Sequence, residues 1–255
     1  MIDVVRVMDF AERGVVEVVT DAAALADAAA ERVISAVLAA VDDRGVATVA
    51  LSGGSTPKAM AELLAQPDYR DRLPWDAVTW FWGDERWVPL ASDDSNAGVA
   101  MRGLFRHVPA KPPQIQPWTT TGDAAQAALS YATTIRRTVG AGDPPRFDLI
   151  LLGMGDDGHT ASLFPGTAAV HEAVEITLAH RVEKLDTTRL TFTPPLINAA
   201  HEVVFLVGGA GKAERLAEVL MGPVDIDRLP SQVVRPVVGD LIWLVDEAAA
   251  AQLGG

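Results

Sequence analysis

Short runs of valine and leucine alternate with longer helical patterns along most of this chain, and this alternation is what most constrains the fold. A strand that is followed by a helix and then by another strand is typical of a mainly parallel sheet covered by helices on both faces. In such a sheet the carboxyl ends of the strands meet at one edge, which is where ligands bind. The turns that follow the strands are therefore the first place to look for a site.

The elements follow from hydrophobic periodicity and helix caps. Asp21 is a candidate N-cap for an alanine-rich helix that runs to about Asp42. The predicted fold is α/β, with a mainly parallel Rossmann-like sheet, helices on both faces and a small additional strand-containing subregion, all in a single domain over residues 1–255. Predicted strands cover 4–7, 15–19, 46–51, 78–82, 147–152, 181–184, 189–193, 202–207 and 241–245, and further helices 57–65, 95–105, 123–139, 194–200, 211–220 and 247–252.

The turn after the predicted strand 147–152 contains three glycines, two carboxylates and a histidine, in the run Gly153-Met154-Gly155-Asp156-Asp157-Gly158-His159-Thr160. Its glycine spacing matches a dinucleotide-binding fingerprint. That fingerprint needs a long helix after the glycines, but Pro165 and Gly166 leave room for about two helical turns at most. We therefore interpret the turn as a catalytic loop. His159 is the candidate proton carrier, because imidazole changes its protonation near neutral pH.

A second turn, Ser52-Gly53-Gly54-Ser55-Thr56, joins a predicted strand to a helix. Backbone N–H groups at a helix N-terminus bind oxyanions, and the two hydroxyl groups add further donors. The pattern predicts a phosphate-binding turn formed by Gly53, Gly54, Ser55 and Thr56. It is not a nucleotide P-loop, because the Gly-Lys-Ser/Thr ending is missing.

Charged residues lie near two further strand ends. Asp84 and Arg86 follow the predicted strand 78–82, and Arg86 is a candidate for binding a carboxylate, a phosphate or a developing oxyanion. Lys212 follows a glycine-rich turn after the predicted strand 202–207 and is a second candidate for binding an anion. Arg189, on the predicted strand 189–193, is a weaker candidate for binding an anion.

Composition excludes several classes of function. The formal net charge of −13 disfavours nucleic acid and anionic membranes as partners, so an anionic ligand needs a locally positive site. There is no cysteine and no His-Glu-x-x-His motif, so we expect no metal and no cofactor. The opening residues 1–6 lack the pattern of a signal peptide, and we expect a cytoplasmic protein that is a monomer or a weak homodimer.

These turns, in this order, resemble those of the 6-phosphogluconolactonases. The matching pieces are Ser52 to Pro57, Trp82 to Pro89, Ser95-Asn96, Gly153 to Gly166 and Gly208 to Lys212. The resemblance implies the α/β fold shared with glucosamine-6-phosphate deaminases, and hydrolysis of 6-phosphogluconolactone in the pentose phosphate pathway without a metal. The deaminase branch has a glutamate five residues after the histidine, where this chain has Phe164. That departure favours the lactonase.

The expected mechanism combines these residues. The substrate phosphate lies on Gly53, Gly54, Ser55 and Thr56, with positive charge from Lys212 and Arg189. His159 removes a proton from the attacking water, Arg86 or nearby backbone N–H groups stabilise the oxyanion, and Asp84 positions either sugar hydroxyls or the histidine. A deaminase, a dehydrogenase and a non-catalytic sugar-phosphate sensor remain open as alternatives.

Overall fold

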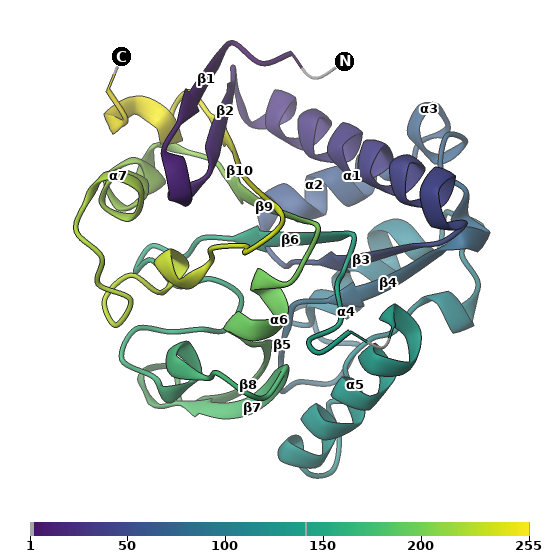
Figure 1. The fold of residues 1–255 in the computed structure, drawn as a ribbon. Helices are drawn as coiled ribbons and strands as arrows, with labels where there is room; N and C mark the ends of the chain where they lie inside the picture. Colours follow the sequence, from purple (N-terminus) through teal and green to yellow (C-terminus); the bar gives the residue numbers. More distant parts are fainter. Residues whose placement is uncertain (1–2, 141, 255) are drawn as a thin grey trace.

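The computed structural model describes residues 3–140 and 142–254 and so leaves out Met1 and Ile2 of the opening segment. A seven-stranded sheet crosses the molecule in the order β1-β2-β10-β9-β6-β3-β4 (Figure 1). All of its neighbouring pairs are parallel except β1 with β2. The strands are β1 (Arg6–Asp9), β2 (Val15–Val19), β3 (Ala47–Leu51), β4 (Val78–Trp82), β6 (Leu149–Gly153), β9 (Glu202–Val207) and β10 (Asp240–Asp246).

Helices flank this sheet, as the alternation predicted. The long first helix, α1 (Ala22–Arg44), begins at Asp21, whose carboxylate accepts hydrogen bonds from the N–H groups of Ala23 and Ala24. It ends at Gly45, which adopts a left-handed φ of 77°. The other helices are α2 (Ser55–Leu64), α3 (Pro67–Arg70), α4 (Asn96–Ala100), α5 (Ala124–Val139), α6 (Pro194–Asn198) and α7 (Ala213–Met221).

A second, three-stranded antiparallel sheet lies below the central sheet in Figure 1. It has the order β5-β8-β7, with β5 (Asp84–Arg86), β7 (Thr177–Val182) and β8 (Thr187–Phe192). It is the predicted strand-containing subregion, but the prediction missed β5, because three polar residues carry no apolar period. The prediction also placed the starts of the other two strands too late. The strand predicted over 181–184 begins at Thr177, and the strand predicted over 189–193 begins at Thr187.

Other boundaries differ from the prediction in small ways. The first strand is Arg6–Asp9, two residues later than predicted, and the helix predicted over 95–105 is α4 followed directly by a π-helical segment, Met101–Phe105. The predicted closing helix is a 3-10 turn, Ala249–Gln252, and α3 was not predicted.

The core fills the space on both sides of the central sheet. Aromatic side chains join the two sheets: Trp118 stacks on Tyr131 of α5 with ring centroids 3.7 Å apart, and Phe192 of β8 packs against Phe147 at 5.3 Å. Trp80 and Trp82 are fully buried in this core. The small sheet therefore sits on the same hydrophobic core as the large one.

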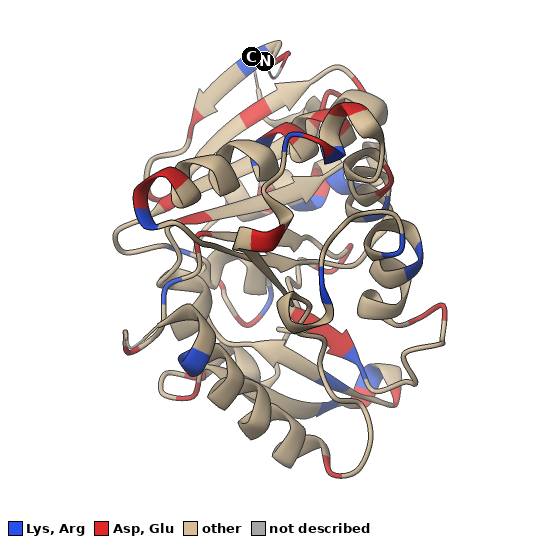
Figure 2. Cartoon of the chain, turned by 90° about the vertical axis from the view of Figure 1, so that its right-hand side faces the viewer, with Lys and Arg blue, Asp and Glu red and all other residues tan. Residues whose placement is uncertain are grey.

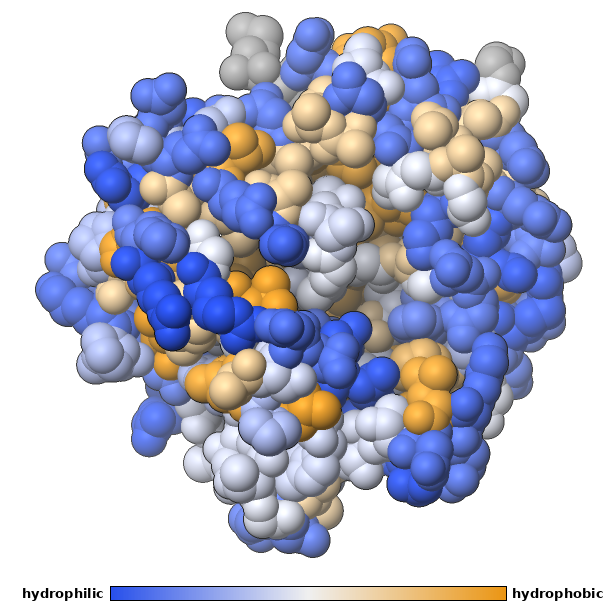
Figure 3. Space-filling model, turned by 180° about the vertical axis from the view of Figure 1, so that it is seen from behind, coloured by the Kyte–Doolittle hydropathy of each residue, from blue (hydrophilic) through white to orange (hydrophobic). Residues whose placement is uncertain are grey.

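The surface mixes both signs of charge. Figure 2 shows acidic and basic residues interspersed over helices and loops of one side, and Figure 3 shows a hollow near the middle of another face, with apolar residues in it and hydrophilic residues around it. In the part of the chain that the structure describes, no helix is both long and apolar enough to cross a membrane.

Candidate active site

The turns after β3, β4, β6 and β9 lie along one edge of the central sheet, because these four strands are parallel neighbours. The register places Leu51 beside Trp82 and Gly153 beside Leu206. A Cβ atom built on Gly153 would lie 3.9 Å from the Oγ atom of Ser52, so the histidine-bearing turn begins next to the serine–glycine turn. The structure thus confirms the prediction that these turns lie at one edge of the sheet.

The serine–glycine turn leads directly into α2. Gly54 is the N-cap residue with a left-handed φ of 115°, and no side chain caps this end of the helix. Within the described residues, no hydrogen bond occupies the backbone N–H groups of Gly53, Gly54, Ser55 or Thr56. Unoccupied N–H groups at a helix N-terminus form an anion-binding site.

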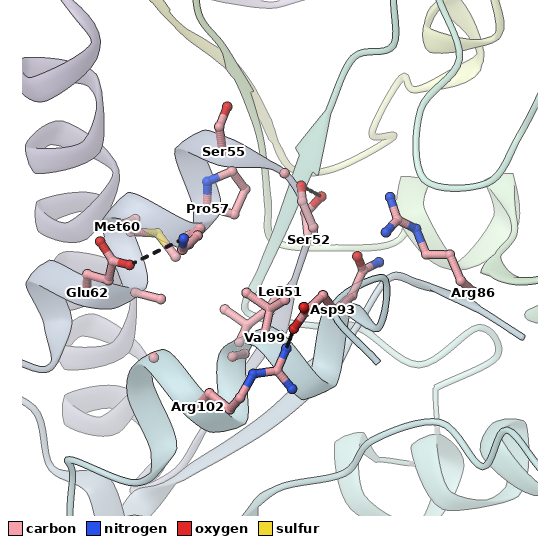
Figure 4. Close-up of a pocket in the computed structure, with 17 residues that line it drawn as sticks. Leu51, Ser52, Ser55, Pro57, Met60, Glu62, Arg86, Asp93, Val99 and Arg102 are labelled. Carbon is pink, nitrogen blue, oxygen red and sulfur yellow. Dashed lines mark hydrogen bonds and ion pairs between the residues drawn. The ribbon is translucent and has the colours of Figure 1, made fainter. Parts of the chain in front are cut away.

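A cavity of about 670 Å³ opens beside this turn. Gly53, Gly54 and Ser55 form part of its wall, and Arg86 and Asn96 form another part. The rest comes from α2, from α4 and from the segment around Arg102. Figure 4 shows Arg86 approaching from β5 and Ser52 and Ser55 from the end of β3 and the start of α2. Thr56 and His159 do not line this cavity.

His159 lies on the turn after β6 with 28% of its side chain exposed. Its Nδ1 atom is 2.5 Å from Oδ1 of Asp157, and its ring stacks on Phe164 with centroids 4.2 Å apart. The hydrogen bond from His159, together with the charges of His159 and Lys184, holds the pKa of Asp157 far below its usual range despite partial burial. The carboxylate therefore fixes one ring nitrogen and leaves Nε2 without a hydrogen bond in the described residues.

Lys212 reaches the histidine-bearing turn rather than the cavity beside α2. Its Nζ atom donates to the backbone oxygen of Met154 at 2.9 Å and to Oδ1 of Asp156 at 2.5 Å. The side chain of Lys212 is 26% exposed, whereas that of Asp156 is 87% exposed. A positive charge thus lies on the β9 side of His159.

Asp84 is buried and lies beneath the loop that follows His159. Its Oδ2 atom accepts a hydrogen bond from Oγ of Ser162 at 2.7 Å, and its Oδ1 atom accepts one from Nδ2 of Asn96 at 3.2 Å. With 8% of its surface exposed, Asp84 makes no hydrogen bond to His159, whose acidic partner is Asp157. Neither the partners of Asp84 nor the role of Ser162 could be read from the sequence.

Arg86, Arg189 and His180 form a row across the small sheet. Arg86 is the register partner of Arg189 on β8, and Arg189 is that of His180 on β7, so the three side chains share one face. Burial and the neighbouring Arg86 lower the pKa of Arg189, and burial lowers the pKa of His180. Nε2 of His180 lies 2.8 Å from the backbone oxygen of Ser162, so this face lies under the catalytic-loop candidate.

The sequence analysis did not identify Glu85, which has a structural role at the start of α4. It is 1% exposed, and its carboxylate accepts hydrogen bonds from the N–H groups of Arg86, Asn96 and Ala97 and from Oγ of Ser95. Burial raises the pKa of Glu85, and the backbone hydrogen bonds oppose this rise. Over residues 3–140 and 142–254, no cluster of three or more histidine and carboxylate side chains is arranged to hold a metal ion.

Comparison with known proteins extends these observations. The family model described as glucosamine-6-phosphate isomerases/6-phosphogluconolactonase matches residues 20–243. A 6-phosphogluconolactonase from Synechocystis sp. is 43% identical over 221 residues, which cover 84% of this chain and 88% of the relative. Another from Nostoc sp. is 40% identical over 242 residues, covering 93% and 98%.

A solved structure of similar shape is 6-phosphogluconolactonase from Trypanosoma cruzi, with a TM-score of 0.84 and 27% sequence identity. The match covers 98% of this chain and 100% of that one. The resemblance noted in the sequence is thereby confirmed, together with the α/β fold class. Because the family model matches residues 20–243, this chain belongs to the family of glucosamine-6-phosphate isomerases and 6-phosphogluconolactonases.

Proposed function

We propose that this chain is an enzyme of the pentose phosphate pathway that hydrolyses 6-phosphogluconolactone to 6-phosphogluconate, with His159 as general base. Relatives that carry the name 6-phosphogluconolactonase and cover nearly the whole chain support the reaction. The observation that carries the assignment of the base is the 2.5 Å contact between Nδ1 of His159 and Asp157. With a proton on Nδ1, the lone pair of Nε2 is available to accept one from water.

The reaction needs one proton transfer in each direction. Nε2 of His159 takes a proton from water as the water oxygen attacks the lactone carbonyl. The tetrahedral oxyanion that forms is stabilised by Arg86 or by backbone N–H groups at the sheet edge. When the bond from carbonyl carbon to ring oxygen breaks, the imidazolium returns the proton to that oxygen, and the ring-opened acid leaves.

The phosphate is bound on the side of the cavity formed by α2. The free N–H groups of Gly53, Gly54, Ser55 and Thr56 supply donors, and Arg189 supplies positive charge. Lys212 adds its positive charge from the histidine-bearing turn, outside the cavity. This arrangement gives an acidic protein a locally positive site for an anionic sugar.

The test is a proton-release assay with fresh 6-phosphoglucono-δ-lactone, corrected for spontaneous hydrolysis. The wild-type protein should release protons well above the spontaneous rate, and His159→Ala should lower kcat by about 10²-fold or more with little change in KM. Wild-type protein without activity would reject the reaction. An active His159→Ala variant would reject only the assignment of the base.

A further inference from the structure

Asp84 lies where two parts of the site meet, although it faces neither the cavity wall at α2 nor the imidazole. One oxygen of its carboxylate accepts from Ser162, three residues after His159, and the other accepts from Asn96. Asp84, Ser162 and Asn96 are exposed by 8%, 1% and 6% of their surfaces. Buried polar groups with complete hydrogen bonding fix one arrangement of the elements that carry them.

The second arm of this network reaches the phosphate-binding turn. Nδ2 of Asn96 donates to both the backbone oxygen and Oδ1 of Asp84, at 3.0 and 3.2 Å. The amide oxygen of Asn96 lies so close to Gly53 that a Cβ atom there would be 2.0 Å from it. Asn96 therefore acts as a spacer between β5 and the serine–glycine turn.

We propose that Asp84 is a positioning residue that fixes the loop carrying His159 relative to the phosphate-binding turn, through Ser162 on one side and Asn96 on the other. This inference rests on the proposed function for its kinetic consequences, but not for its structural ones. It assigns Asp84 no proton transfer and no contact with substrate.

An asparagine at position 84 separates this role from a catalytic one. Its amide oxygen can accept from Asn96, and its amide N–H can donate to Oγ of Ser162, because a serine hydroxyl both donates and accepts. A hydrogen-bonding role therefore survives Asp84→Asn, whereas proton transfer by the carboxylate does not. Asp84→Ala removes the arm to Ser162 and weakens the arm to Asn96, which keeps only its bond to the backbone oxygen of residue 84. Ser162→Ala removes only the arm to the His159 loop.

The kinetic experiment compares these variants in the proton-release assay across pH. Asp84→Asn should keep kcat within about threefold of wild type with an unchanged pH profile. Ser162→Ala should lower kcat about tenfold with little change in KM, and Asp84→Ala should lower kcat and raise KM, each by about tenfold. If Asp84→Asn is as inactive as Asp84→Ala, or loses a limb of the pH profile, Asp84 transfers a proton and the proposal is wrong.

Ser95→Ala is the matched control. Ser95 is 1% exposed and donates its hydroxyl to Glu85, the neighbour of Asp84 on β5, at 3.0 Å. This variant also loses a buried bond from a serine to a carboxylate, together with the N-cap bond that the same hydroxyl accepts from Gly98 of α4, but it leaves the His159 loop alone. Ser95→Ala should lower the Tm and keep the wild-type kcat. A fall in kcat as large as that of Ser162→Ala would show that the loss of any buried hydrogen bond to β5 lowers kcat equally, which would contradict the proposal.

Hydrogen exchange of the unliganded protein tests the network without reference to any reaction. Asp84→Ala should speed amide exchange in both 153–166 and 58–64, the hydrogen-bonded part of α2 that follows the serine–glycine turn, and Ser162→Ala should speed it only in 153–166. Unchanged exchange in both segments of folded Asp84→Ala would overturn the proposal, and if that variant does not fold, Ser162→Ala decides by the same criterion. Should the wild-type protein fail to hydrolyse the lactone, the proposed function fails, while this exchange pattern still decides whether the network exists.

Discussion

Individual glycines in the site provide space for side chains of the protein itself. In the sequence, glycines crowd two turns, one predicted to bind phosphate and the other predicted to be a catalytic loop. In the structure, Gly53 lies against the side chain of Asn96 and Gly155 lies against the ring of His159. The sequence thus showed which positions need glycine. It could not show which side chains require that space, because Asn96 and His159 reach these glycines only through tertiary packing.

Replacing Gly155 by alanine tests how finely the imidazole is placed. The added Cβ atom would lie 2.1 Å from Nδ1 of His159, so the ring must move and its contact with Asp157 must lengthen. A displacement of about 1 Å of a catalytic group can cost ~10²-fold in rate, so kcat should fall by about that factor. Gly211→Ala is the control for the assay, since nothing lies within 4 Å of the added atom; equal activity of the two variants would contradict the placement of the ring.

The carboxylate of Asp157 should make stability depend on pH in acid. Its hydrogen bond with His159 lowers the pKa of Asp157 in the folded protein, so the folded state keeps this carboxylate ionised at pH values where the unfolded chain is protonated. The resulting stabilisation is present above the ordinary aspartate pKa of about 3.9 and is lost as pH falls below it. Urea unfolding of wild type and Asp157→Asn should therefore differ most near pH 6 and converge toward pH 3, whereas a constant difference would rule out this linkage.

At the scale of elements, the parallel strands and long helices were predictable and the small sheet was only partly so. Apolar runs such as β6 and β9 identify buried strands by composition alone. In contrast, β5 consists of Asp84, Glu85 and Arg86, and it is a strand because β8, about a hundred residues later in the chain, pairs with it. A local pattern cannot reveal a strand whose partner is so distant.

Glu85 should be essential to the start of α4. The two backbone N–H groups that it binds there, those of Asn96 and Ala97, have no other acceptor among the described residues. In Glu85→Gln one acceptor oxygen becomes an N–H donor that faces other donors, and an unsatisfied buried group costs about 1–3 kcal/mol. Thermal unfolding should show a Tm several degrees lower than that of wild type. Glu183→Gln, with a side chain that is 86% exposed, is the control and should leave the Tm unchanged.

Across the whole molecule, the candidate site draws on both sheets, which explains why its residues were only partly predictable. The turn at Gly53 and Gly54 and the loop of His159 belong to the central sheet, and they meet because parallel strands end at one edge. Arg86 and Arg189 come from the small sheet and share its face through strand register. The sequence suggested both arginines as anion ligands, but their adjacency depends on β5, which was not predicted.

Binding of a phosphorylated acid should therefore stabilise the molecule as a whole. A ligand that contacts the serine–glycine turn and Arg189 together joins the two sheets, and at about 100 times its Kd it adds ~2.7 kcal/mol to the free energy of unfolding. For a chain of 255 residues this corresponds to a rise in Tm of roughly 5–10 °C. We expect this rise with 6-phosphogluconate, and a much smaller one with gluconate at the same concentration, because gluconate lacks the phosphate.

Arg189→Met tests which sheet the anion depends on, because it removes the charge and keeps an unbranched apolar side chain. The rise in Tm with 6-phosphogluconate should fall to about that seen with gluconate. Arg181→Met is the matched control: Arg181 neighbours His180 on β7, so its side chain points to the opposite face of the small sheet, and it pairs with Glu183 and Asp186. Because the turn at α2 is intact in both variants, a full ligand response in Arg189→Met would mean that the N–H groups of α2 bind the phosphate without the small sheet.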